Sequence, residues 1–384
     1  MQTIHWLGTG LSAMPGLKSL IESGYKLLVY NRTVEKATDA LSGVRGDYLV
    51  FPFSLNVLEG HVKAGDIVVS MLPGEFHLGL AKRCLALDAH FVSSSYISPE
   101  MQGLHEAALG KKLCLVNEVG LDPGIDHSLS HALVADYKKS AVFSADNQHS
   151  FLSYCGGLSA VPNDFCYKFS WSPLGVLKAL MSPSLSIRKG QQYYVDKPWE
   201  AVESYALPMP WGEESFEVYP NRDSLPFIKQ YQLDGGINIK QFVRGTLRYQ
   251  GWKKAWSNIF SEVDLLNADE APGRLNQLSD QLWDQYAFAK GERDRVVMTV
   301  ELKVQKNEHT LWHKQYCFDT LGNEKGSAMA QLVSHSVALA VQSVADAEIS
   351  PGVSAAPDDA NLVKRALDKT NSISDHFVLI DHLS

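Results

Sequence analysis

The chain has 384 residues, of which 45% are hydrophobic and 20% charged, and its formal net charge at neutral pH is -8. This length gives room for two or three domains with cores of their own, and the composition is that of a globular protein. An acidic chain lacks the basic face that nucleic acids and anionic membranes require, so we expect neither as a partner.

The cellular environment is predicted from the same sequence. The first residues do not form a signal-peptide pattern, and we find no apolar run of about 18 residues, so we expect a soluble, cytoplasmic protein. The five cysteines are scattered and never form a Cys-x-x-Cys pair, which favours reduced thiols. No His-Glu-x-x-His motif or cluster of Cys and His occurs, so we expect no metal.

Predicted strands and helices alternate through the first third of the chain. A strand-like run over residues 3–7 leads into a glycine-rich turn, and a helical pattern follows over residues 15–22. Alternation of this kind is typical of a doubly wound parallel sheet, the Rossmann-type α/β fold. The further strands are predicted over residues 25–30, 66–72, 90–94 and 112–116, and the further helices over residues 34–41, 77–87 and 99–109.

The glycine-rich turn matches the G-x-G-x-x-G/A fingerprint of dinucleotide-binding proteins. In this pattern the first glycine permits the turn, the second lets the backbone approach a pyrophosphate, and the small last residue lets the helix pack on the strand. The phosphates would then lie at the amino end of the helix. The residues predicted to bind a cofactor are Gly8, Thr9, Gly10, Leu11 and Ser12, with Ala13 as the small residue.

The end of the second predicted strand bears on the choice of cofactor. An Asp or Glu about 20 residues past the fingerprint usually holds the ribose hydroxyls of NAD. This chain has Asn31, Arg32 and Thr33 there, a cation with neighbouring polar groups in place of a carboxylate. The pattern favours NADP over NAD, because an arginine can bind the 2′-phosphate. The alternative for Arg32 is a solvated cation at the start of the next helix.

Four later stretches are dense in polar residues and glycine. Residues 117–127 form a glycine-punctuated loop that enters a helix, and loops after parallel strands are where ligands bind in such sheets. Residues 153–157 are predicted to be a strand running into a turn with exposed backbone. Two arginine-containing stretches follow at residues 220–224 and 244–249.

Taken together with the glycine turn, these stretches resemble the glutamate-forming saccharopine dehydrogenase family, also called saccharopine reductases. The resemblance spans nearly the whole chain, and eight motifs in the family's order are more specific than one glycine turn. Besides the turn, the motifs are SSYISP (94–99), NEVGLDPGIDH (117–127), SYCGGL (153–158), YKFSWSP (167–173), PNRDS (220–224), RGTLRYQG (244–251) and GSAMA (326–330).

The resemblance implies a reversible reductive amination in lysine metabolism and amino-acid biosynthesis. In that reaction 2-aminoadipate 6-semialdehyde, L-glutamate and NADPH give saccharopine, NADP+ and water. The family's fold implies an NADP-binding Rossmann domain over residues 1–125, completed by residues 345–384. It also implies an α+β substrate domain over residues 126–344, which mediates homodimerisation and carries a small helical insertion over residues 252–292. Trp256, Ile259, Phe260 and Val263 recur there at helical spacing, and we interpret them as core.

The family's site residues carry over by motif. Besides the glycine turn, Asn31, Arg32 and Thr33 would contact the adenosine ribose phosphate, and Ser95, Leu121 and Pro123 would lie by the nicotinamide half. The saccharopine-contacting positions correspond to Tyr96, Asp122, Arg222, Thr246, Leu247 and Arg248. Arg222 and Arg248 are the expected clamps for the substrate's carboxylates, with Arg244 as a further candidate, because an arginine fork binds both oxygens of a carboxylate. For each arginine the alternative is a surface salt bridge.

The family also suggests Asp122, Tyr96 and Cys155 as the catalytic residues that transfer protons when the imine forms and is hydrolysed. Each has a structural alternative: Asp122 as the start of an Asp-Pro-Gly turn, Tyr96 as packing, and Cys155 as a buried thiol. His127 follows Asp126 near a predicted helix start, where a helix-capping pair is at least as good an interpretation as a general base.

Three other functions are alternatives. A hydrolase using Cys155 as nucleophile, with His127 or His131 as base, lacks the local signatures of cysteine hydrolases and leaves the glycine turn unexplained. A non-catalytic NADP-binding regulator would share the fold. A carboxynorspermidine-type reductase would need one carboxylate clamp fewer. The chain departs from the family pattern at residues 159–166, where the family has a longer stretch, so the outer part of the substrate is in question.

Overall fold

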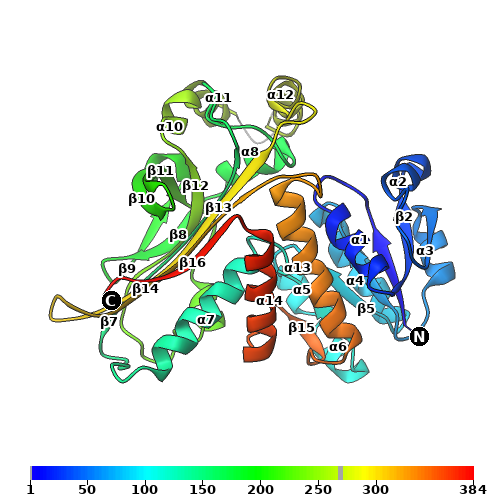
Figure 1. Cartoon of the computed structure of the whole chain (residues 1–384), viewed down its shortest axis with the longest axis horizontal. Coiled ribbons are helices and arrows are strands. Elements are labelled where there is room, and N and C mark those ends of the chain that lie inside the picture. The colour runs from blue at the N-terminus through cyan, green and yellow to red at the C-terminus, as the bar shows by residue number, and fades with distance from the viewer. Residues whose placement is uncertain (1, 267–270) are drawn as a thin grey trace. The chain divides into compact units, whose positions relative to one another are not determined.

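The computed structural model describes residues 2–266 and 271–384, and these divide into two compact units (Figure 1). The first unit contains Met1–Ser128 and Glu324–Ile373. The second contains Leu129–Asn323 and Ser374–Ser384. The chain therefore leaves the first unit once and returns to it before it ends.

A seven-stranded sheet forms the centre of the first unit, and all its described pairings are parallel. Its inner strands are nearly continuous apolar runs because both faces of the sheet are covered. The spatial order reverses at β1, which lies between β4 and β2. In spatial order the strands are β15 (Gly352–Ser354), β6 (Cys114–Val116), β5 (His90–Ser93), β4 (Ile67–Ser70), β1 (Thr3–Leu7), β2 (Lys26–Asn31) and β3 (Tyr48–Pro52).

Helices cover both faces of this sheet, and each face has a hydrophobic core of its own. One core is formed with α1 (Met14–Glu22), α13 (Ala328–Ala345) and α14 (Ala360–Ile373). The other is formed with α3 (Leu55–His61), α4 (His77–Ala86), α5 (Pro99–Gln102) and α6 (His105–Lys111). Helix α2 (Val34–Ala40) and the 3-10 turn η1 (Gly74–Phe76) complete the connections. The predicted doubly wound parallel sheet is confirmed.

Helix α13 is long and apolar enough to cross a membrane by length and composition alone, which the sequence analysis did not anticipate. Its apolar window is 61% buried within the structure. It packs along α1 and contacts β4 and β5 of the sheet. In this fold it is a core helix.

The boundaries of the units correct the predicted domain division in two places. Residues 324–344 belong to the first unit, because α13 packs against α1 and joins the core of the parallel sheet. Residues 374–384 belong to the second unit, because strand β16 (His376–Asp381) pairs with β14 there. Of the predicted carboxyl-terminal segment, residues 345–373 therefore complete the Rossmann-type unit, where β15 extends the sheet beside β6.

A mixed sheet forms the second unit, which helix α7 (Ile125–Lys139) enters from the first. Along the main path of this sheet the order is β10-β11-β12-β7-β13-β14-β16, and β8 and β9 extend from β12. The strands besides β16 are β7 (Gln148–Ser159), β8 (Ser184–Arg188), β9 (Gln191–Val195), β10 (Glu203–Met209), β11 (Gly212–Pro220), β12 (Ile239–Tyr249), β13 (Asp294–Lys306) and β14 (His309–Leu321).

Strand β7 corrects one predicted turn. Residues 153–157 were expected to run from a strand into a turn, whereas β7 continues through both Gly156 and Gly157. Gly156 has no side chain where the neighbouring strand comes very close: a Cβ there would lie 2.4 Å from the carbonyl oxygen of Leu247. This glycine therefore allows close strand packing.

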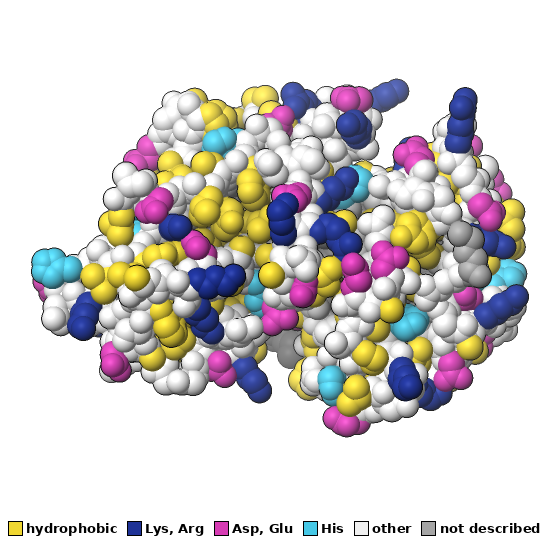
Figure 2. All heavy atoms as spheres, turned by 60° about the horizontal axis from the view of Figure 1, so that its bottom comes forward, with side chains coloured by type: hydrophobic (Ala, Val, Ile, Leu, Met, Phe, Trp, Pro, Cys, Tyr) yellow, Lys and Arg dark blue, Asp and Glu magenta, His cyan; other side chains and the backbone are white. Residues whose placement is uncertain are grey.

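A small helical group lies beside the mixed sheet and shares one aromatic core. It contains α8 (Pro173–Leu180), α10 (Trp252–Ala255), α11 (Ser257–Asp264) and α12 (Ala271–Tyr286). Trp256, Phe260 and Val263 are buried in this core, with Ile259 partly buried against it. Residues 267–270 of the predicted insertion lie outside the described residues. The short elements η2 (Pro198–Ala201) and α9 (Pro226–Gln230) complete the unit. On the molecular face shown in Figure 2, basic and acidic side chains are interspersed.

We predict that Gly16→Ala destabilises the fold. A Cβ on Gly16 would lie 2.0 Å from the carbonyl oxygen of Ser334 in α13, and a backbone atom cannot move aside cheaply. Overpacking of this kind lowers the free energy of unfolding by about 3 kcal/mol or more.

The control is Gly110→Ala on the exposed face of α6, where a Cβ meets nothing within 4 Å. It should raise stability by up to about 1 kcal/mol. Equal denaturation curves for the two variants would contradict the packing argument.

Candidate functional site

The glycine turn lies at the carboxyl end of β1, where the strand order of the parallel sheet reverses. Gly8 has a φ of +94°, which favours glycine, and its N–H donates to the Tyr30 carbonyl at 2.8 Å. The turn then leads directly into α1, whose first residue is Met14. In open parallel sheets this reversal point is where ligands bind.

The turn has room and polar groups for a dinucleotide phosphate. The Thr9 side chain is buried, and its hydroxyl has no hydrogen-bond partner among the described residues. A Cβ on Gly10 would meet nothing within 4 Å, so the backbone there is open to a close ligand. A buried hydroxyl without a partner is destabilising unless a ligand or water satisfies it. These residues fit the phosphates of a dinucleotide.

The end of β2 presents the residues expected at the adenosine ribose. The Asn31 side chain is fixed in place, since its Oδ1 accepts from the Thr9 N–H at 3.4 Å and its Nδ2 donates to the Thr33 carbonyl at 2.8 Å. Arg32 is exposed and forms no ion pair with any described residue. An exposed arginine beside an ordered asparagine can meet an anion from solution.

Tyr96 and Asp122, which the sequence analysis selected as catalytic residues, are in contact. The Tyr96 hydroxyl donates to Asp122 Oδ1 at 3.1 Å. Tyr96 follows strand β5 and Asp122 follows strand β6, so both belong to loops at the carboxyl edge of the sheet. A tyrosine hydroxyl hydrogen-bonded to a carboxylate can hold a proton for transfer.

A tight turn carries Asp122. The Gly120 N–H donates to the Pro123 carbonyl at 2.8 Å, and a Cβ on Gly124 would lie 2.2 Å from the Gly120 carbonyl oxygen. Gly124 is therefore required by the close approach of the two backbone segments, and a Cβ on Gly120 would lie 2.9 Å from the Cβ of Ser94. Leu121 is buried, and the Ser95 carbonyl accepts from the Glu118 N–H at 3.0 Å. The positions predicted to lie by the nicotinamide half thus belong to the same two loops.

Glu118 was not among the predicted site residues, and His127 was interpreted as part of a helix cap. Glu118 lies in the loop after β6 and His127 in the first turn of α7; both are buried, and Glu118 Oε2 lies 3.1 Å from His127 Nε2. Glu118 could have been found by the rule already applied to Asp122, because it stands two residues after the end of β6. A buried carboxylate beside the predicted catalytic pair is a candidate for a role in the site.

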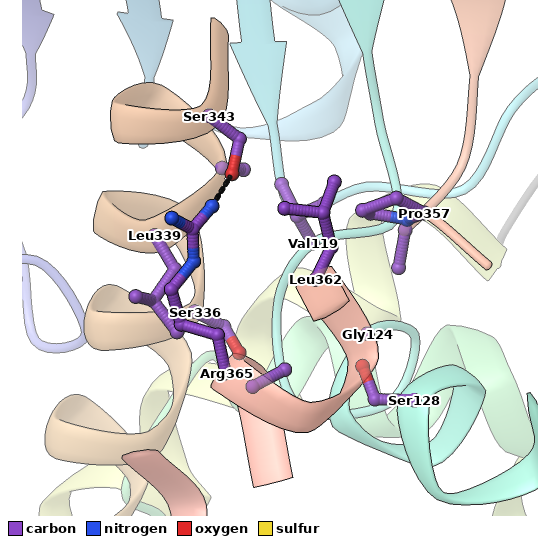
Figure 3. Close-up of a pocket in the computed structure, with 12 residues that line it drawn as sticks. Val119, Gly124, Ser128, Ser336, Leu339, Ser343, Pro357, Leu362 and Arg365 are labelled. Carbon is purple, nitrogen blue, oxygen red and sulfur yellow. Dashed lines mark hydrogen bonds between the residues drawn. The ribbon is translucent and has the colours of Figure 1, made fainter. Parts of the chain in front are cut away.

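A cavity of about 40 Å³ lies behind the loop that carries Asp122 (Figure 3). Val119, Gly124 and Ser128 line one side, and residues of α13 and α14 line the other. Arg365 donates to the Ser343 hydroxyl at 2.7 Å across its wall. The volume suits a few water molecules and is far too small for a dinucleotide. No residue of the glycine turn lines this cavity, so it is not the proposed cofactor site.

In the second unit, Arg244, Thr246 and Arg248 share one face of β12 because alternate residues of a strand point the same way. Cys155 of β7 and Tyr219 of β11 lie directly opposite Thr246 in the neighbouring strands. Four of the predicted residues and one neighbouring arginine are therefore in one part of this sheet: Cys155, Arg244, Thr246, Leu247 and Arg248. Leu247 differs from the others, since its side chain is buried in the core on the opposite face and only its backbone can reach a ligand.

Arg248 is a buried cation in an aromatic cage. Its guanidinium lies 4.7 Å from the centre of the Tyr167 ring and 5.7 Å from those of Tyr219 and Trp252. Its Nη1 donates to the Leu247 carbonyl at 3.0 Å, but no carboxylate of the described residues pairs with it. Its Nε and the Trp252 indole N–H are buried without partners in the described structure. Burial raises the pKa of Tyr219, and the neighbouring Arg248 cation opposes that rise.

Two other arginines lie close to this face. Arg244 is buried, with its guanidinium 3.8 Å from the centre of the Phe227 ring. Arg222 is exposed in the turn after β11 and has a φ of +57°. That turn is fixed to β12, because the Asn221 N–H donates to the Arg244 carbonyl at 2.9 Å. The roles of Arg222, Thr246 and Cys155 toward a substrate stay predictions.

The fold and the glycine turn together define a class of protein. A parallel sheet with the strand order 3-2-1-4-5-6, a glycine turn after β1 and an open backbone at Gly10 are the features of a Rossmann-type dinucleotide-binding protein. Comparison with known proteins narrows that class to a family.

The model of the saccharopine dehydrogenase C-terminal domain matches residues 120–374. The saccharopine dehydrogenase [NADP(+), L-glutamate-forming] of Pyricularia oryzae is 36% identical over 280 residues, covering 71% of this chain and 59% of that protein. The enzyme of the same name from Schizosaccharomyces pombe is 28% identical over 453 residues, covering 96% of each chain. The chain belongs to the saccharopine dehydrogenase family.

A solved structure supports the fold assignment. The apo saccharopine dehydrogenase (L-Glu forming) of Saccharomyces cerevisiae superposes with a TM-score of 0.79 at 24% identity, over 99% of this chain and all of that chain. The fold is therefore that of the family. The match with this chain spans only part of several curated relatives, for example 59% of the Pyricularia oryzae protein.

We predict that Gly10→Ala weakens binding of NADPH and NADH alike without lowering stability. The new methyl group contacts no protein atom but takes the space in which the backbone meets the pyrophosphate. We expect affinity to fall at least about tenfold, or about 1.4 kcal/mol, in calorimetric titrations. Gly60→Ala in α3 is the control, since a Cβ there also meets nothing within 4 Å. Unchanged affinity in Gly10→Ala would remove the turn from the binding site.

Proposed function

We propose that the protein is an NADP(H)-dependent saccharopine reductase, which joins 2-aminoadipate 6-semialdehyde to L-glutamate by reductive amination and also runs in reverse. One observation carries the choice of substrate: the buried Arg248 has no carboxylate partner among the described residues. In a chain of this family, such a cation is the expected receptor for a substrate carboxylate. The P. oryzae and S. pombe relatives bear the name of this activity.

The surroundings of Arg248 favour an anionic ligand. A buried charge is unfavourable without a counterion, and the aromatic rings offset only part of that penalty. The free Nε of Arg248 and the free indole N–H of Trp252 can both donate to an anionic oxygen. Saccharopine has three carboxylates, and Arg244 and Arg222 are nearby candidates for the others. Arginine is suited to this task because its planar fork binds both carboxylate oxygens.

The preference for NADP rests on the end of β2. Asn31 stands where NAD-binding chains usually have a carboxylate, so no negative charge at that position repels a 2′-phosphate. Arg32 is exposed and has no ion-pair partner in the described part of the chain, so it is available to bind that phosphate. The Thr33 hydroxyl is a further candidate donor.

Proton transfers are assigned to the loops after β5 and β6. When bound, the nicotinamide cofactor exchanges a hydride with the carbon of the substrate's C–N bond. Asp122 favours a cationic imine by its negative charge, and Tyr96 hydrogen-bonds to it at 3.1 Å. This pair is proposed to pass protons to and from the nitrogen and the departing water. Cys155, buried in β7, is the third candidate.

The homodimer implied by the resemblance and the cytoplasmic location expected from the sequence stay predictions. The same holds for the absence of nucleic-acid and membrane partners. The alternative among related enzymes is a carboxynorspermidine-type reaction. It differs from the proposed reaction in its amine substrate, so a comparison of substrates distinguishes the two.

The proposed reaction is tested by measuring reduction of NADP+ and NAD+ with a panel of amines. We expect saccharopine with NADP+ to give the highest kcat/KM, because it supplies both the carboxylates and the 2′-phosphate that the chain is built to bind. Carboxynorspermidine and simple amino acids are the comparison substrates. A higher kcat/KM for carboxynorspermidine would refute the proposed substrate, and no turnover with any amine would favour a non-catalytic regulator.

Arg248→Met is predicted to weaken saccharopine binding without lowering the stability of the protein. Removing a buried cation that lacks a counterion should leave the free energy of unfolding of the unliganded protein equal to or above that of the wild type. The KM for saccharopine should rise about 10-fold to 100-fold, which corresponds to the loss of about 1.5 to 3 kcal/mol of charge-assisted hydrogen bonding. The affinity for NADPH should not change. Steady-state kinetics and thermal unfolding measure these effects.

Arg295→Met is the matched control for Arg248→Met. Arg295 is as buried as Arg248, but it pairs with Glu214 at 2.8 Å and Asp319 at 2.6 Å. Removing it leaves two carboxylates without their cation, so we expect a loss of about 3 to 5 kcal/mol. If Arg248→Met destabilised the protein as much as Arg295→Met, Arg248 would be structural.

A further inference from the structure

Glu118 makes hydrogen bonds to the backbone on both sides of Tyr96. It follows β6 with a φ of +55°, and only 4% of the residue is exposed. Its N–H donates to the carbonyl of Ser95 at 3.0 Å, and its side-chain Oε1 accepts from the N–H of Ile97 at 2.9 Å. Ser95 and Ile97 are the residues immediately before and after Tyr96. One residue therefore holds the backbone that positions the Tyr96 side chain.

The other carboxylate oxygen of Glu118 reaches the turn that carries Asp122. Glu118 Oε2 lies 3.1 Å from Nε2 of His127, which is fully buried. His127 Nδ1 lies 3.5 Å from Asp126 Oδ2, and Asp126 Oδ1 accepts from the Gly124 N–H at 2.6 Å. Gly124 is two residues after Asp122. The chain of contacts thus runs from the segment around Tyr96 to the turn of Asp122.

We propose that Glu118 is the positioning residue for the Tyr96–Asp122 pair, an inference that rests on the proposed function. Its carboxylate contacts the backbone on one side and His127 on the other, and no contact to Tyr96 or Asp122 side chains is required. A buried carboxylate is retained only where several hydrogen bonds compensate its burial, and such a group holds its partners rigidly. Rigid support matters because a displacement of about 1 Å in a proton-transfer pair can lower the rate about 100-fold.

The same geometry predicts how substitutions of Glu118 differ. Alanine removes both contacts. Aspartate keeps the charge but is one methylene too short to reach Ile97 and His127 together. Glutamine keeps an oxygen for the Ile97 N–H, and its amide can donate to His127 if that ring nitrogen accepts. Glutamine should therefore restore most of the function that alanine loses, which a requirement for charge alone does not predict.

Asp66 offers a matched control in the same unit. Its buried carboxylate accepts from the N–H groups of Thr3 and Lys63, both at 2.9 Å, and lies 3.0 Å from Nε2 of the buried His5. It immediately precedes β4, at the amino ends of the strands rather than the carboxyl edge. Asp66→Ala therefore removes the same kind of contacts at a place without catalytic residues.

The first test is kinetic and uses the full chain with saccharopine and NADP+. We expect Glu118→Ala to lower kcat about 100-fold. The Kd for NADPH should stay within about twofold of the wild type, and the KM for saccharopine should rise far less than kcat falls, because the arginines proposed to bind its carboxylates are untouched. Glu118→Gln should recover kcat to within about fivefold of the wild type, and Asp66→Ala should leave kcat unchanged. Should Glu118→Ala not fold, Glu118→Asp takes its place with the same expected loss of kcat.

The second test needs no turnover and uses a double-mutant cycle on the unliganded protein. Tyr96→Phe removes the hydrogen bond to Asp122 and should shift the unfolding equilibrium constant about fivefold in the wild type and in Asp66→Ala. In Glu118→Ala or Glu118→Asp the same change should have no effect, because the pair is already displaced. Additive effects in the cycle, or an unchanged kcat in these variants, would overturn the proposal. If the wild type does not oxidise saccharopine, the proposed function fails and the cycle alone decides the role of Glu118.

Discussion

The first unit depends on the contact between Gly16 and Ser334, which lie 318 positions apart in the chain. The Gly16 N–H donates to the Ser334 hydroxyl at 2.7 Å, and that hydroxyl donates to the Ala330 carbonyl at 2.6 Å. Helices α1 and α13 can approach this closely only because residue 16 has no side chain. The amino end of α1 is thereby fixed, and with it the direction of the glycine turn that precedes the helix. A helix from late in the chain thus supports the proposed cofactor site.

Two buried arginines of the mixed sheet show how the same side chain serves different purposes. The strand registers place Arg295 on the face of Tyr154 and Tyr249, and Arg248 on the opposite face with Tyr219. Arg295 has two carboxylates and the Tyr249 hydroxyl within hydrogen-bond reach, so its charge is neutralised inside the protein. Arg248 has three aromatic rings and no described carboxylate. A charge left uncompensated by the fold is one that a ligand can compensate.

Much of the first unit could be predicted from the sequence, because its strands are apolar runs separated by turns. Strand β3 and helix α3 were not predicted. β3 is the edge strand and none of its residues is fully buried, so its burial leaves no strong pattern. The single helix expected over residues 99–109 is two short helices, α5 and α6, which are separated near Gly103. The unit boundaries were misjudged because the sequence does not show that α13 packs on α1 or that β16 pairs with β14.

The candidate site was predicted where a residue's chemistry and its place at a strand end agree. Tyr96 and Asp122 were selected from motifs, and the parallel sheet brings their loops together. Glu118 stands in the same motif as Asp122, and its place after β6 makes it a candidate by the same rule. Its proposed role, however, comes from backbone contacts with the loop after β5, which no sequence pattern encodes.

The residues proposed for the two tasks belong to different units of the chain. The glycine turn, the Tyr96–Asp122 pair and Glu118 belong to the first unit, whereas the arginines proposed to bind carboxylates belong to the second. We therefore expect changes to those arginines to alter which amine is bound more than they alter dinucleotide binding. The short segment over residues 159–166, where the chain departs from the family pattern, also lies in the second unit. Substrate selection in this chain is accordingly expected to depend on the mixed sheet, and the chemistry on the parallel one.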